Sequence, residues 1–246
     1  MEVQFIDHIK KNNLFDNSHN LLLAYSAGVD SSVLFNLLLN CKYKFSVAHC
    51  NYKLRGQHSD NDQRFIIEKA KTHKVKYHTK EFDISKINFK KSQSVQMKCR
   101  QLRYKWFNEL SKKYGYDFIL TAHHLNDSIE TFFINIFRGT GIEGLTGIPI
   151  KRDKFIRPLL FATKDSILEY AKKNNVHYRE DKSNESKNYK RNKIRSDLIP
   201  IISVISENYE EIFYKSFKNL KNLSDTYKYL VKLEIQRIMT KEFDLV

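Results

Sequence analysis

The sequence predicts an α/β fold in which an open parallel sheet carries helices on both faces and is followed by a helical C-terminal appendage. Strand-like apolar runs alternate with helical patterns between residues 21 and 138. Repeated strand–helix units favour parallel pairing with helices on both faces of the sheet. Polar segments follow three of the strand-like runs, at Ser26, 49–55 and 123–127. Because ligands in such sheets bind beyond the carboxyl ends of the strands, these segments are expected to converge.

Four strands and four helices are expected in the part of the chain that forms the sheet. The strands are predicted at residues 21–25, 45–50, 76–82 and 118–122. The helices are predicted at 30–39, 62–72, 94–114 and 127–138. Ser59 and Asp62 have capping-box spacing, which indicates a helix start. After Pro200, apolar residues recur at three- and four-residue steps. We therefore expect one domain over residues 1–200 and a helical extension over 201–246.

Composition favours a polyanionic partner. The 246 residues include 43 Lys and Arg against 28 Asp and Glu, which gives a net charge of +15. Nucleic acid is the favoured partner, and a solvated basic surface is the alternative. Cys41, Cys50 and Cys99 lack paired spacing and are expected to be thiols. No targeting segment and no apolar run of membrane-spanning length is visible, so a soluble, cytoplasmic protein without a membrane partner is expected.

The turn that follows the first strand is the most informative segment. Ser26-Ala27-Gly28-Val29-Asp30-Ser31-Ser32 has small side chains and leads directly into a helix. A helix N-terminus presents unpaired N–H groups and the positive end of the dipole, which suits a phosphate. An ordinary N-cap is the structural alternative. No Gly-Lys-Ser/Thr ends the turn, so it is not a Walker loop.

Two later segments also carry candidate functional groups. Arg100 and Arg103 share one face of the predicted helix 94–114, where they could clamp phosphate or carboxylate oxygens or form a solvated face. Asp127 and Glu130 share a face of the next helix, where a capping box is the alternative. Adjacent histidines at 123–124 do not have zinc-site spacing. The segment 139–147 holds four of the seven glycines and is either a lid or a close backbone approach to a ligand.

Taken together, these motifs resemble the tRNA(Ile)-lysidine synthetase family of PP-loop ATP pyrophosphatases. The resemblance runs from about residue 21 to residue 200 in the order of the family. Its segments are the loop at 26–32, Cys-Arg-x-x-Arg-Tyr-x-x-Phe at 99–107, the Gly-rich stretch at 138–145, Arg-Pro-Leu-Leu at 157–160, Glu-Asp-Lys-Ser-Asn at 180–184 and Arg-Asn-Lys-Ile-Arg at 191–195. It implies the PP-loop, or adenine nucleotide α-hydrolase-like, fold.

The resemblance also implies a reaction and the residues that serve it. ATP activates the wobble cytidine of a CAU-anticodon tRNA(Ile) as an adenylate, and L-lysine then displaces AMP to give lysidine. The residues expected to bind ATP are Ser26, Ala27, Gly28, Val29, Asp30 and Ser31, with Asp30 also a ligand of Mg²⁺. The expected catalytic residues are Asp30, Arg100, His123 and Asp127. The expected tRNA contacts are Lys53, Arg55, Lys190, Arg191 and Arg195.

The sequence departs from the family pattern at three positions. Ala27 replaces a glycine, which is tolerable only at negative φ. Tyr52 stands where a second His is common, and Asn126 stands where the first Asp of a pair is common. Two alternatives stay open: another PP-loop tRNA-modifying enzyme such as a tRNA thiolase, which would share the loop at 26–32, and, given these departures, a catalytically inactive tRNA-binding relative. The sequence also leaves open whether the helical extension forms a homodimer, and it lacks the length of family members with further C-terminal tRNA-binding domains.

Overall fold

The predicted parallel sheet is confirmed, and it lies within one of two compact units. The computed structural model describes residues 1–84, 94–179 and 190–243, with side chains to residue 239. Contacts divide the chain into unit 1, Met1–His124 with Ile150–Lys182, and unit 2, Leu125–Pro149 with Ser183–Val246. The division predicted from the sequence, into residues 1–200 and 201–246, stays a prediction.

The sheet of unit 1 has six strands in the order β3-β2-β1-β4-β6-β5. Its members are β1 (Leu21–Ala24), β2 (Phe45–Asn51), β3 (Lys76–Glu81), β4 (Phe118–Leu120), β5 (Lys151–Arg152) and β6 (Phe155–Ile156). Every neighbouring pair is parallel except the hairpin β5–β6. The hairpin was not predicted, because two-residue strands leave no periodic pattern in a sequence.

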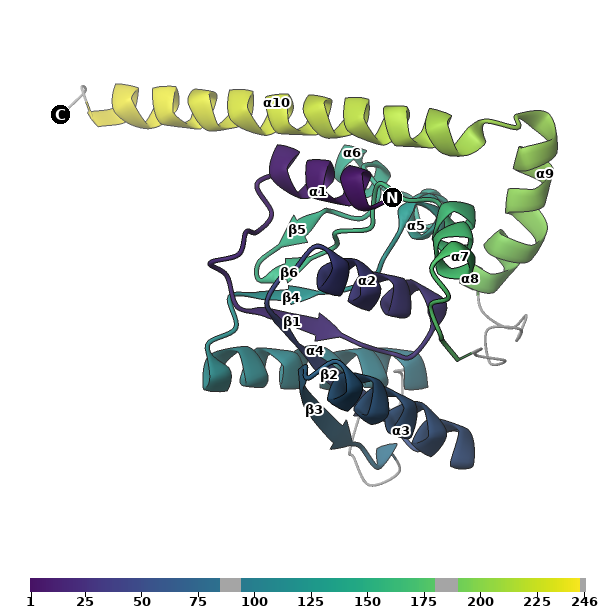
Figure 1. Cartoon of the computed structure of the whole chain (residues 1–246). Helices are drawn as coiled ribbons and strands as arrows, with labels where there is room; N and C mark the ends of the chain where they lie inside the picture. Colours follow the sequence, from purple (N-terminus) through teal and green to yellow (C-terminus); the bar gives the residue numbers. More distant parts are fainter. Residues whose placement is uncertain (85–93, 180–189, 244–246) are drawn as a thin grey trace. The chain divides into compact units, whose positions relative to one another are not determined.

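Helices cover both faces of this sheet, as predicted (Figure 1). They are α1 (Glu2–Lys11), α2 (Val29–Asn40), α3 (Gln57–Thr72), α4 (Val95–Tyr114) and α7 (Lys164–Lys173). Successive side chains of a strand point to opposite faces. Leu21 and Leu23 therefore join a core cluster with Val33 of α2, whereas Leu22 joins a second cluster with Phe107 of α4.

Helix α3 begins earlier than the sequence indicated. Its N-cap is Gly56 rather than Ser59, and the expected capping box is wrong. Ser59 Oγ instead accepts a hydrogen bond from the Arg55 amide at 3.2 Å, and the Asp62 carboxylate pairs with arginine side chains. Capping-box spacing was misleading here because the same carboxylate serves a tertiary contact. Helix α4 begins as expected, with Ser94 Oγ accepting from the Met97 amide.

Unit 2 is helical. It contains α5 (Leu125–Ile136), α6 (Ile142–Leu145), α8 (Lys190–Lys193), a π-helical turn (Ile194–Leu198), α9 (Ile199–Ile205) and α10 (Tyr209–Phe243). Its core is aromatic: Phe132 and Phe133 of α5 contact Phe213 and Phe217 of α10, with ring centroids 5.4–5.8 Å apart across the two helices. This contact explains the periodic apolar residues near the start of α10, and the predicted helical appendage is confirmed.

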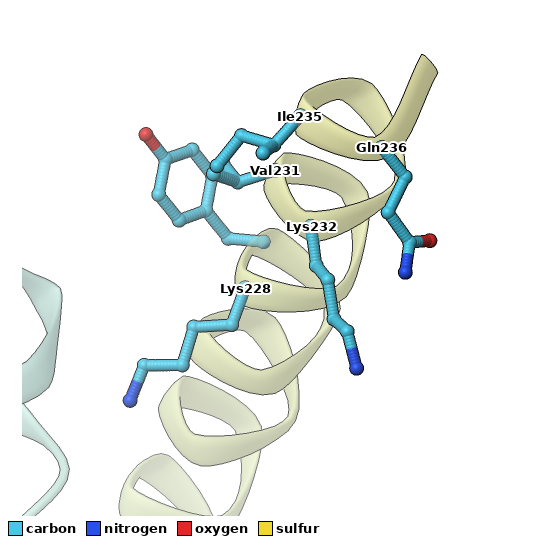
Figure 2. Close-up of a pocket in the computed structure, with 6 residues that line it drawn as sticks. Lys228, Val231, Lys232, Ile235 and Gln236 are labelled. Carbon is cyan, nitrogen blue, oxygen red and sulfur yellow. The ribbon is translucent and has the colours of Figure 1, made fainter. Parts of the chain in front are cut away.

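The distal half of α10, yellow in Figure 1, has an exposed apolar face. A shallow hollow on it is lined by Tyr227, Lys228, Val231, Lys232, Ile235 and Gln236. Figure 2 shows Val231 and Ile235 projecting from the helix, with Lys228 and Lys232 on neighbouring turns. The homodimer left open by the sequence stays a prediction. Among the residues described, no helix is both long and apolar enough to cross a membrane.

Candidate active site

The turn between β1 and α2, where the sequence predicts an anion site, leads directly into a helix N-terminus. Gly28 is the N-cap of α2, with φ −67° and ψ 163°. The first helical hydrogen bond runs from the Ser32 amide to the Gly28 carbonyl at 3.0 Å. The amides ahead of Ser32 therefore have no partner in the preceding turn of the helix. Together with the helix dipole, they suit an anionic ligand.

Ala27 has a φ of +68°, in the left-handed region. This conformation costs an alanine about 1–2 kcal/mol relative to a right-handed one. The alanine is therefore not at the negative φ that would make it a tolerable replacement for glycine. Its methyl group is fully buried in the core, and its carbonyl accepts from the Arg179 amide at 3.0 Å and from Ser32 Oγ at 3.3 Å. Burial and hydrogen bonding offset the strain.

Hydroxyl groups brace the turn from within. Ser31 Oγ donates to the Gly28 carbonyl at 3.0 Å and accepts from the Ser26 amide at 3.3 Å. Ser26 Oγ lies 3.1 Å from Ser31 Oγ. Ser31 is buried, whereas Ser26 is exposed. Of these two serines, both predicted to bind ATP, Ser31 therefore stabilises the conformation of the loop. Ser26 has the hydroxyl group that a bound molecule can reach.

Asp30 lies in the first turn of α2 and contacts two other elements. Its Oδ1 is 2.5 Å from Lys164 Nζ, at the start of α7, and 3.9 Å from Nε2 of the buried His124. Lys164 was not identified from the sequence, and no motif in its vicinity pointed to it. The arrangement places a carboxylate and an ammonium group beside the helix N-terminus, which is a suitable environment for a metal-bound polyphosphate.

The residues at this site fit the magnesium ion that the resemblance implies. Mg²⁺ prefers oxygen ligands and is usually held by one or two carboxylates together with phosphates and water. Asp30 supplies a half-buried carboxylate, and Ser26 a hydroxyl. Among the described residues, no three His, Cys, Asp or Glu side chains group into a metal cage. The donor set therefore suits a cation that arrives with its phosphate ligands rather than one held by protein alone.

His49, near the end of β2, forms a hydrogen bond to the residue that precedes the loop. Its Nδ1 lies 2.9 Å from the Tyr25 carbonyl, which can only accept, so Nδ1 carries the proton. Burial lowers the pKa of His49 below its ordinary value, because the charged form is poorly solvated there. A neutral imidazole thus holds the first carbonyl of the turn at physiological pH.

Two predicted catalytic residues of unit 1 have local partners. The Arg100 guanidinium lies over the Tyr104 ring, 4.7 Å from its centroid, and donates to the Tyr104 hydroxyl at 3.0 Å. His123 Nδ1 is 2.9 Å from Thr121 Oγ1. The predicted Asp127 belongs to unit 2, where it lies in the first turn of α5.

The predicted tRNA contacts of unit 1 take part in ion pairs. Lys53 Nζ is 2.6 Å from Asp60 and 3.2 Å from Glu81. An Arg55 guanidinium nitrogen is 2.9 Å from the buried Asp62 carboxylate. Exposed pairs such as that of Lys53 contribute little energy and can exchange partners, whereas the contact of Arg55 with a buried carboxylate is harder to break.

The predicted tRNA contacts of unit 2 surround a buried carboxylate. Glu130 is 2% exposed; its two oxygens lie 2.6 Å from Arg195 Nε and 3.0 Å from Arg191 Nε. Burial raises the pKa of Glu130 even though both arginines oppose the shift. The sequence showed the Asp127–Glu130 spacing but not this pairing. Lys190 is exposed, and the predicted motif at 180–184 lies outside the described residues.

Comparison with known proteins accounts for this combination of fold and motifs. The PP-loop domain family matches residues 1–202. A tRNA(Ile)-lysidine synthase from Chlorobaculum tepidum is 34% identical over 244 residues, an alignment that covers 97% of this chain and 72% of that protein. The chain belongs to the tRNA(Ile)-lysidine synthase family.

Other members of the tRNA(Ile)-lysidine synthase family are similar over a smaller share of their length. The synthase from Bacteroides thetaiotaomicron is 33% identical, over 98% of this chain and 57% of the relative. The synthase from Porphyromonas gingivalis W83 is 37% identical, over 89% of this chain and 49% of the relative. The chain thus spans about half the length of these two relatives. Among solved structures, the U34-tRNA thiolase from Methanococcus maripaludis has a TM-score of 0.72 at 18% identity, over 89% of this chain and 78% of that one, which shows the shared fold.

Proposed function

We propose that the chain ligates L-lysine to the wobble cytidine of the CAU-anticodon tRNA(Ile), consuming ATP and forming lysidine, AMP and pyrophosphate. The observation that carries the proposal is the loop Ser26–Ser32, which is strained at Ala27 and whose Asp30 pairs with Lys164, in a chain that belongs to this family.

In the first step, O2 of the cytidine attacks the α-phosphorus of ATP and pyrophosphate leaves. The amides at the start of α2 and the Ser26 hydroxyl hold the leaving pyrophosphate. Asp30 is the residue that would hold Mg²⁺, and the ion supplies neutralisation of phosphate charge when bound. Lys164, at 2.5 Å from Asp30, supplies a further cation beside the phosphates.

In the second step, the lysine ε-amine attacks C2 of the adenylated base and AMP leaves. The amine must lose a proton, and a carboxylate can both orient it and accept that proton. Asp127 has this role in our proposal, with Arg100 and His123 as further contacts of the reacting groups. Asn126 cannot serve as a base. Its amide donates to Glu210 at 2.6 Å, so it has a structural role within unit 2.

The distribution of charge supports RNA as the substrate. Unit 1 carries 30 of the 43 Lys and Arg residues but 16 of the 28 Asp and Glu residues, so nearly the whole positive excess belongs to the unit with the sheet. Phosphate contacts of basic side chains dominate nucleic-acid affinity. An anticodon loop presents unstacked bases that a protein can read. Lys53, Arg55, Lys190, Arg191 and Arg195 are the proposed contacts, and the cytoplasm the proposed location.

The test is pyrophosphate release from ATP with tRNA(Ile) transcript and lysine supplied singly and together. The proposal expects release only with tRNA, and lysidine in a nuclease digest analysed by mass spectrometry only when lysine is also present. A transcript with uridine in place of the wobble cytidine is the matched control. In a parallel reaction with sulfide in place of lysine, a thiolated nucleoside would favour the thiolase alternative. Tight tRNA binding with unmodified cytidine would favour an inactive relative.

A further inference from the structure

Asp62 is a buried carboxylate that joins two arginines from distant parts of unit 1. It lies on α3 and is 7% exposed. Its Oδ2 is 2.9 Å from a terminal guanidinium nitrogen of Arg55, and its Oδ1 is 2.6 Å from Arg179 Nε. Each oxygen thus receives a separate charge-assisted hydrogen bond. Arg55 comes before α3, whereas Arg179 follows α7, 117 residues beyond Asp62 in the chain.

Arg179 connects this ion cluster to the candidate ATP loop. Its backbone amide donates to the Ala27 carbonyl at 3.0 Å, while its side chain is held by Asp62. Ala27 is the residue with left-handed φ, and the conformation of the loop depends on it. A turn in which an alanine is strained needs further contacts to persist. The Ala27 carbonyl accepts hydrogen bonds from the Arg179 amide and from Ser32 Oγ, and of these two donors Arg179 is the one that lies outside the loop.

A buried ion cluster is weak grounds for a role in stability alone, since apolar residues of similar volume often stabilise as well. Its distinctive property is directional: one charge-assisted hydrogen bond to each oxygen ties the two guanidinium groups to a single carboxylate. The Arg55–Asp62–Arg179 cluster therefore restricts where the Arg179 backbone can lie. That backbone supplies the contact to the loop.

We propose that Asp62 is a positioning residue which, through Arg179, holds the Ala27 carbonyl and so keeps the loop amides directed at the pyrophosphate of ATP. The inference rests on the proposed function, because it assumes that the loop binds ATP. It adds a residue outside the loop that sets ATP affinity without touching the nucleotide.

The experiment compares Asp62→Asn with the wild type by calorimetric titration with ATP and Mg²⁺, and by tRNA-dependent pyrophosphate release. We expect the Kd and KM for ATP to rise about tenfold, with kcat within about twofold of wild type. Asp62→Glu is expected to recover most of the loss. Glu109→Gln, which breaks the exposed Lys80–Glu109 pair, serves as the control and should bind ATP normally.

A double-mutant cycle separates positioning from general destabilisation. Arg179→Ala keeps the amide that bonds Ala27 but removes the side chain that Asp62 holds. It should therefore weaken ATP binding as much as Asp62→Asn, and the double variant should lose little more. Wild-type ATP affinity in folded Asp62→Asn would overturn the inference. If Asp62→Asn does not fold, Arg179→Lys takes its place with the same expected rise in KM. Failure of the wild type itself to bind ATP would instead contradict the proposed function.

Discussion

Lys164 and Asp30, which lie 134 positions apart in the chain, form an ion pair between the first turns of two helices, with Nζ 2.5 Å from Oδ1. The carboxylate expected to bind a metal ion thus has a cationic partner of its own. A divalent cation that reaches Asp30 must compete with this ammonium group. Once displaced, the ammonium remains beside the loop, where it can contact a phosphate.

Replacement of Asp30 tests the loop assignment directly. Asp30→Ala is expected to abolish AMP formation while leaving the fold intact, because Asp30 is half-buried at the surface of unit 1 and contributes no apolar contact to the core. AMP release and far-UV circular dichroism measure the two properties. Near-normal turnover would refute the role of the loop.

Replacement of Lys164 should separate its contact with a phosphate of ATP from its competition with Mg²⁺ for Asp30. In Lys164→Met, loss of a phosphate contact raises the KM for ATP several-fold, and loss of the competitor lowers the Mg²⁺ concentration needed for half-maximal rate. Steady-state rates over a grid of ATP and Mg²⁺ concentrations measure both. Lys172→Met, in the last turn of the same helix, is the control and should change neither. A higher Mg²⁺ requirement in Lys164→Met would contradict the proposed competition between Lys164 and Mg²⁺ for Asp30.

Gly147 is expected to tolerate no side chain. Its φ is +75°, and an added Cβ would lie 3.2 Å from Ser128 Cβ and 3.4 Å from the Phe217 ring. Gly139, with φ +69° and open space around it, provides the matched control. Both Gly→Ala changes incur the backbone strain of about 1–2 kcal/mol. Gly147→Ala should lose about 1–3 kcal/mol more through overpacking. Urea unfolding measures the difference in the free energy of unfolding. Equal losses in the two variants would show that the aromatic core of unit 2 rearranges to accommodate the added methyl group.

His8 should make stability fall in acid. Its ring lies 5.0 Å from that of Phe161, and burial lowers the pKa of His8 from 6.5 to about 4. The unfolded chain therefore binds a proton at higher pH than the folded one, and stability falls as the pH drops from 6.5 towards 4. In His8→Leu, the decrease in stability that comes from protonation of His8 should be absent. Melting temperatures of both proteins between pH 7 and 4 provide the test, since parallel curves would exclude the effect.

Lys190 offers a test of the RNA interface that disturbs no buried carboxylate. Lys190→Ala is expected to weaken tRNA affinity and to reduce the slope of log affinity against log salt by about 0.7–0.9, while ATP affinity stays unchanged. Lys215→Ala, which removes an exposed partner of Glu211 on α10, is the control. Fluorescence titrations at several salt concentrations measure the slope. An unchanged slope would remove Lys190 from the interface.

Local patterns were sufficient to predict much of the fold. The alternation of strand-like and helical segments located β1 to β4. Continuous apolar residues mark β1, a central parallel strand with two buried faces, whereas the edge strand β3 is largely polar and partly exposed. The same reasoning missed β5 and β6, which are too short to show a period. It also misplaced the start of α3, because Asp62 has the spacing of a cap and the contacts of a tertiary ion pair.

The sequence by itself determined the family, the open parallel sheet and the loop at Ser26–Ser32, because these depend on contiguous motifs and on short-range periodicity. Only the tertiary structure decided that Ala27 is left-handed, that Lys164 pairs with Asp30 and that Arg179 reaches the Ala27 carbonyl. These contacts join residues more than a hundred positions apart. Their partners are set by how the strands and helices fold together, and no local pattern encodes that distance.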